Sequence, residues 1–101
     1  MIKEKLKEII ARRISIDPED DYGRKKCWEE ALLLVKDNPE LTLRFITEEA
    51  TDEEVFWFSE RLCEMYDISQ DERFIQAFQN RADQMTDAEM KQSILQEISW
   101  V

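Results

Sequence analysis

The chain has 101 residues with a hydrophobic content of 43%, enough for one core, and it fits a single domain over residues 1–101. Its one glycine and two prolines favour helix over sheet. Its formal net charge of −10 disfavours direct contact with nucleic acid or with an anionic membrane.

The N-terminal part of the chain predicts two helices. Apolar residues recur at helical spacing over about 2–13 and again over about 24–37. Asp17-Pro18 has the form of a helix start, although the acidic stretch that follows it delays the second helix. The apolar stripe of that helix comprises Trp28, Ala31, Leu32 and Val35. Leu33 falls outside the stripe, so we expect this helix to be buried on two sides.

Start signals divide the rest of the chain into four helices. Asn38-Pro39 supplies a cap and a first-turn proline for a helix over about 39–49, with Leu41, Phe45 and Ile46 inside. Three S/T-x-x-E capping boxes follow, and they pair Thr51 with Glu54, Ser69 with Glu72, and Thr86 with Glu89. They predict helices over about 52–66, 70–85 and 87–100.

These elements predict an all-α fold of about six short antiparallel helices, because only a few residues connect one helix to the next. Helix starts about 17 residues apart fit either three stacked helical hairpins or a compact bundle, and the spacing approaches the tetratricopeptide period of 34. The specific tetratricopeptide signature is missing, so the sequence leaves both arrangements open.

The N-terminus and the apolar runs bear on location. MIKEKLKEII lacks the long apolar stretch of a secretory signal, and no run reaches the roughly 20 apolar residues of a membrane span. We therefore expect a cytoplasmic protein that does not enter a membrane.

Residues that could support catalysis or metal binding are scarce. The chain has no histidine and only one glycine, so it lacks a proton shuttle for neutral pH and a glycine-rich phosphate loop. Cys27 and Cys63 lie among apolar helical positions, and we expect two buried free thiols. We predict no enzymatic activity, no cofactor and no bound metal.

The charge is unevenly distributed along the chain. Residues 1–37 carry nine Lys/Arg and nine Asp/Glu, whereas residues 38–101 carry five Lys/Arg and fifteen Asp/Glu. The whole net charge therefore lies in the second part. A one-sided field of this kind attracts basic proteins and accelerates their association.

The predicted fourth helix has an aromatic residue on its acidic side. At 100° per residue, Trp57 lies opposite the apolar stripe, among Glu53, Glu60, Arg61 and Glu64. Either another helix covers Trp57, or Trp57 is an anchor within an acidic binding face. Trp100, at the end of the last predicted helix, is either a lid on the core, which we favour, or a second exposed aromatic.

Some of the acids near Trp57 are explained by helix electrostatics and others are not. First-turn carboxylates are stabilised by the helix dipole, whereas Glu60, Glu64 and Asp67 lie in the middle or at the C-terminal end of their helix, where negative charge is unfavourable. We therefore predict a partner-binding site. Its members are Glu53, Trp57, Glu60, Glu64, Asp67 and Asp71.

The run TDEEVFWFSE, residues 51–60, resembles a segment of small acidic all-helical proteins that are encoded beside polymorphic bacterial toxins. These are the immunity proteins of systems such as contact-dependent growth inhibition, and the resemblance extends over about residues 38–80. It implies a non-catalytic cytoplasmic protein that forms a tight one-to-one complex with one toxin domain. It further suggests a basic toxin, with a ribonuclease favoured, whose active site the acidic face would cover.

Two other classes of function remain open. The chain could be a DNA mimic such as an anti-restriction protein, although Arg61, Arg73 and Arg81 interrupt its acidic residues. It could also be a helical adaptor that recruits another protein. A monomer is expected, and a homodimer through Trp57 is the alternative.

Overall fold

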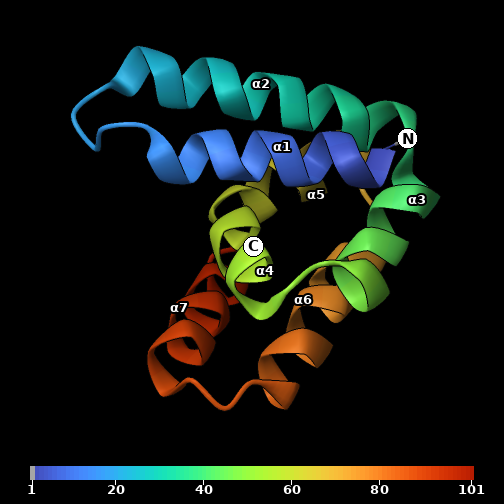
Figure 1. Ribbon diagram of the computed structural model, residues 1–101. Helices are drawn as coiled ribbons and strands as arrows, with labels where there is room; N and C mark the ends of the chain where they lie inside the picture. Colours follow the sequence, from blue (N-terminus) through green and yellow to red (C-terminus); the bar gives the residue numbers. More distant parts are fainter. Residues whose placement is uncertain (1) are drawn as a thin grey trace.

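The computed structural model describes residues 2–101, which are almost wholly helical and contain no strand (Figure 1). The elements in chain order are α1 (Ile2–Ser15), α2 (Asp21–Asp37), α3 (Pro39–Arg44), a π-helical turn η1 (Phe45–Glu49), α4 (Asp52–Phe58), a 3₁₀ turn η2 (Ser59–Arg61), α5 (Leu62–Ser69), α6 (Arg73–Gln84) and α7 (Ala88–Ser99). The predicted all-α fold is confirmed, and each predicted helix corresponds to one helical stretch.

The helices form a compact bundle rather than three stacked hairpins. In Figure 1, α1 and α2 make an antiparallel hairpin at one side, α6 and α7 make another at the opposite side, and α4 lies between them. The bundle measures 31 × 28 × 24 Å. A middle hairpin is not formed, because α3 packs against α1, α2 and α6 instead of lying along α4.

Phe58 in α4 organises the core. Its ring stacks on Trp28 of α2 at 6.2 Å between centroids, and it meets Phe45 and Phe78 edge-on at 6.0 and 6.2 Å. All four rings are almost completely buried. Offset and edge-to-face pairs of this kind stabilise a core beyond the burial of apolar area. One residue of the central helix therefore joins α2, η1 and α6.

The predicted helix starts are confirmed in part. Thr51 and Glu54 form the complete capping box of α4. The box at Ser69 is wrong, since Ser69 belongs to α5 and donates its hydroxyl proton to the carbonyl of Met65. The box at Thr86 is also wrong, because Asp87 accepts from the first backbone N–H groups of α7.

At two further helix starts, α2 and α3, the capping residue also differs from the prediction. Asp20 caps α2 by accepting from the backbone N–H of Gly23, so this helix begins three residues before its predicted start. Asn38 precedes α3, with Pro39 in the first turn as predicted, but its side chain donates to the carbonyl of Leu34 at the end of α2 instead of capping α3.

The predicted helix over 52–66 is interrupted at η2. The Ser59 hydroxyl donates to the carbonyl of Phe56 at 2.6 Å, a local bond that bends helices. The backbone then passes through a 3₁₀ turn before α5 begins at Leu62. A single helical wheel therefore does not describe residues 52–66, and the side chains after Ser59 are redirected.

A buried arginine holds the π-helical turn η1. Arg81 of α6 donates from Nη1 to the carbonyl oxygens of Ile46 and Ala50 at 2.7 and 2.9 Å, and its Nη2 pairs with Asp52 at 2.8 Å. These carbonyls lie at the end of a helical segment, where the helix supplies no backbone N–H group to bond them. One side chain thus satisfies the end of η1 and ties it to the start of α4.

Two apolar residues lie outside the core, against prediction. Leu33 is 61% exposed and Leu41 is 45% exposed. α2 therefore buries only one face, because nothing packs on the side that carries Leu33. Within residues 2–101, no helix is both long enough and apolar enough to cross a membrane.

Candidate functional site

Glu60 lies in the 3₁₀ turn η2, directly after α4, and connects it to the hairpin of α1 and α2. Its carboxylate accepts two bonds from Arg13 of α1, at 3.1 and 3.0 Å, and one from the indole nitrogen of Trp28 at 3.2 Å. Arg13 and Trp28 are buried. Such a bidentate, partly buried pair has a defined geometry. The unfavourable position of Glu60 in the predicted helix therefore has a structural cause, its bonds to Arg13 and Trp28, and its role in partner binding stays a prediction.

Trp57 is partly buried and contacts Arg13. The guanidinium of Arg13 lies 5.0 Å from the centroid of the Trp57 ring, and the neighbouring Phe56 meets that ring edge-on at 5.6 Å. Two explanations were open for Trp57, a covering helix or an exposed anchor. The covering helix is confirmed in part, since Arg13 of α1 contacts the indole while Trp57 also lines a pocket, and the anchor role stays a prediction.

This pocket lies between α7 on one side and α4 with η2 on the other, and it has a volume of about 200 Å³. It is lined by Phe56, Trp57, Ser59, Glu60, Ser93 and Glu97. Aromatic walls and two carboxylates thus meet in one hollow. We refer to it as the Trp57 pocket.

Glu97 is the residue of this pocket that sequence reasoning missed. Burial raises the pKa of its carboxyl group, and the negative charges of Glu60 and Glu64 raise it further, against a smaller opposing effect of Arg61. No ion pair or side-chain hydrogen bond involves Glu97 within residues 2–101. Glu97 is therefore a partly buried carboxylate without an ion-pair partner within residues 2–101.

A signal for Glu97 was present in the sequence. It lies in the last turn of α7, which contains no basic residue to complement the helix dipole. The same criterion selected Glu60, Glu64 and Asp67. It would have selected Glu97 if it had been applied to the last predicted helix.

Glu64 and Asp67 extend the negative surface along α5. Glu64 pairs with Arg61 at 3.2 Å, whereas Asp67 is exposed and its carboxylate makes no ion pair in the described part of the chain. Burial, and then the charges of Glu64, Glu97 and Asp67, raise the pKa of the partly exposed Cys63 thiol. Cys63 was predicted to be buried, and it is instead partly exposed and near enough to these three carboxylates to feel their charge.

Trp100 is 63% exposed, so the predicted lid on the core is wrong. It follows Glu97 by three residues and keeps helical backbone angles, with φ −92° and ψ −5°. Side chains three positions apart are neighbours on a helix surface. Trp100 is thus a second aromatic residue with an accessible ring, three positions after Glu97 in the chain.

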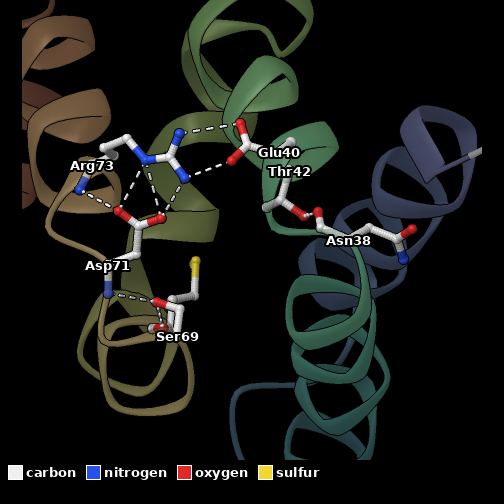
Figure 2. A network of polar contacts seen from close by, with 7 residues as sticks. Asn38, Glu40, Thr42, Ser69, Asp71 and Arg73 are labelled. Carbon is white, nitrogen blue, oxygen red and sulfur yellow. Dashed lines mark hydrogen bonds and ion pairs between the residues drawn. The ribbon is translucent and has the colours of Figure 1, made fainter.

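Asp71 belongs to a different part of the surface. Figure 2 shows its carboxylate against Arg73, whose guanidinium also reaches Glu40 of α3. Hydrogen bonds from Arg73 hold the pKa of Asp71 below its usual range, and Asp71 with Glu40 raises the pKa of Arg73. The charge of Asp71 is therefore compensated locally, beside α3 and α6.

The structure brings most, but not all, of the predicted site residues together. Glu53 is exposed one helical turn before Trp57 and makes no ion pair within residues 2–101. We define the acidic-aromatic surface by its members, which are Glu53, Trp57, Glu60, Glu64, Asp67, Glu97 and Trp100. The net charge of this surface remains negative after Arg13 and Arg61 are counted.

Neither a metal site nor a relative identifies the chemistry. Within residues 2–101, no three His, Cys, Asp or Glu side chains converge as metal ligands would. No protein-family model matches the chain, and no curated protein or solved structure is significantly similar to it.

Proposed function

We propose that this chain is an immunity protein, which binds a basic toxin domain one-to-one and neutralises it through the acidic-aromatic surface. The observation that carries this proposal is the set of carboxylates that make no ion pair within residues 2–101, Glu53, Asp67 and Glu97, of which Glu97 shares a pocket with Trp57. Unpaired carboxylates together with an aromatic side chain favour a cationic protein partner, since aromatic side chains supply binding energy and charge supplies orientation and speed.

A nuclease fits this surface best as the toxin. An enzyme that binds RNA or DNA carries a positive cleft for phosphates, and a negative helical surface can occupy such a cleft. A ribonuclease is favoured by the resemblance of residues 51–60 to immunity proteins of polymorphic toxin systems. The protein would act in the cytoplasm, without catalysis, a cofactor or direct contact with nucleic acid.

The first test is capture of the partner followed by an activity assay. The protein serves as bait in a lysate of its source cell, and the bound proteins are eluted with denaturant and identified by mass spectrometry. We expect one small basic domain at stoichiometric level, whose ribonuclease activity falls to zero as one equivalent of the protein is added. Recovery of restriction or repair enzymes, or a basic domain that stays fully active, would contradict the proposal.

The second test separates the surface from the net charge. The triple variant Glu53→Gln, Asp67→Asn, Glu97→Gln removes three unpaired charges of the acidic-aromatic surface. The triple variant Glu4→Gln, Glu19→Gln, Glu29→Gln removes three exposed charges of the N-terminal hairpin. We expect the first variant to bind the toxin about tenfold more slowly than the second at low salt, because steering depends on the local field. Equal association rates would place the contact elsewhere.

A further inference from the structure

The Trp57 pocket has the dimensions of a side-chain site. Its volume of about 200 Å³ is below the roughly 300–1,000 Å³ typical of pockets for drug-sized ligands and cofactors. It exceeds the space that one water molecule needs by about an order of magnitude. The pocket can therefore admit one long side chain but not a nucleotide.

The lining of the pocket selects a cation with a flat, apolar surface. Phe56 and Trp57 form aromatic walls, and Glu60 and Glu97 place carboxylates among them. The Ser93 hydroxyl makes no hydrogen bond within residues 2–101, so it can accept one from an incoming N–H group. A planar guanidinium can stack on aromatic rings and bind carboxylates at the same time.

Arg13 is an internal example of a guanidinium held by Trp57 and Glu60. Arg13 stacks on Trp57 at 5.0 Å and forms a bidentate pair with Glu60. Arg13 is not one of the residues that line the pocket. Glu97, on the α7 side, has no corresponding cation within residues 2–101, and the pocket therefore presents a second half-site of the same chemistry.

We propose that the Trp57 pocket receives one arginine side chain of the basic partner, whose guanidinium pairs with Glu97 and packs against Trp57. This inference rests on the proposed function for the source of the arginine. It deepens that function by assigning the partner residue that anchors the complex. Burial of an interfacial arginine among aromatic and acidic side chains is typical of binding hot spots.

The inference can be tested without the partner, using N-acetyl-arginine amide as the probe. The probe is titrated into the protein, and the indole N–H signals of the tryptophans are followed by two-dimensional NMR after assignment with Trp57→Phe and Trp100→Phe. We expect the Trp57 signal to shift and saturate. The uncharged analogue N-acetyl-citrulline amide should leave it unchanged.

Matched variants define the role of Glu97. Glu97→Gln should weaken probe binding at least fivefold, whereas Glu89→Gln, an exposed change of equal charge on the same helix, should not alter it. Equal binding to both variants, no shift at Trp57, or tighter binding of N-acetyl-lysine amide would overturn the assignment of an arginine. If the toxin is neutralised equally well by Glu97→Gln, the immunity function stands and this pocket is not its anchor.

Discussion

Individual side chains hold distant parts of this chain together, and Arg81 is the clearest case. Its guanidinium is buried and donates hydrogen bonds to the carbonyls of Ile46 and Ala50, at η1, and to the carboxylate of Asp52. Arg13 has a comparable position between Glu60 and Trp57. Both arginines are buried and paired within the protein, and the charge of Arg13 offsets that of Glu60 in the acidic-aromatic surface.

Arg81→Ala is expected to destabilise the fold by about 3 kcal/mol, because it leaves buried carbonyl oxygens without a donor and an aspartate without its cation. Arg44→Ala is the control, since Arg44 is exposed and its pair with Glu48 contributes less than about 1 kcal/mol. Urea unfolding followed by circular dichroism measures both. Equal losses for the two variants would show that Arg81 is not structural.

Glu97→Gln is expected to raise the melting temperature at pH 7. The folded protein raises the pKa of Glu97, so its ionised form is disfavoured by folding and the neutral glutamine avoids that cost. The advantage should disappear as the pH falls through the raised pKa of Glu97, because the wild-type carboxyl then becomes protonated.

Calorimetry of the wild type, Glu97→Gln and Glu89→Gln over a pH series checks this prediction. Glu89 is exposed in the first turn of α7, where negative charge is favourable, so its glutamine variant should not gain stability. A lower melting temperature for Glu97→Gln at pH 7 would mean that Glu97 stabilises the fold. A carboxylate that costs stability in the unbound protein is consistent with the proposed role in binding.

At the scale of elements, helix ends depend on local backbone chemistry. Gln70 ends α5 in the left-handed conformation, with φ 52° and ψ 33°, and it is the one non-glycine residue with positive φ among residues 2–101. Glycine is preferred at this position because it has no Cβ to collide with the backbone. The end of α5 therefore carries a conformational cost.

Gln70→Gly is expected to stabilise the protein by about 0.5–1 kcal/mol by relieving this strain. The same substitution at Gln92, an exposed position within α7, should destabilise it by about 1 kcal/mol because glycine weakens helix interiors. Thermal unfolding of the two variants should give shifts of opposite sign. A loss at both positions would show that the side-chain bonds of Gln70 to α5 outweigh its strain.

The whole molecule carries ten excess negative charges on a globule whose longest extent is 31 Å. Self-repulsion at this density opposes the compact state and is screened by salt. The exposed ion pairs, such as that of Arg12 with Glu30, are too weak to reverse the effect. The excess charge, which would speed association under the proposed function, therefore lowers the stability of the unbound protein.

Sodium chloride is accordingly expected to raise the melting temperature between 10 mM and 500 mM. The increase should be smaller in the variant Glu53→Gln, Asp67→Asn, Glu97→Gln, because this variant lacks three of the repelling charges. Differential scanning calorimetry at each salt concentration measures both effects. A melting temperature that falls with salt would show that ion pairs dominate the electrostatics of the folded state.

The sequence alone determined the helical class, the positions of the helical stretches and the location of the excess charge, because these follow from periodicity and composition. It also placed Trp57 beside carboxylates. It misjudged the cap at Thr86, where the adjacent Asp87 accepts from the same backbone N–H of Glu89, and the cap at Ser69, which lies within α5. It treated residues 52–66 as one helix, since the bond from Ser59 to Phe56 cannot be foreseen from spacing.

Only the tertiary structure decided which acids are already paired and which are not. Arg13 meets Glu60 across 47 positions of sequence, and α7 brings Glu97 to the Trp57 pocket, so neither relation has a local signal. The exposure of Leu33 and Trp100 was likewise set by which helices pack together. Periodicity reports which face of a helix is apolar, but the neighbour that covers that face depends on the whole arrangement.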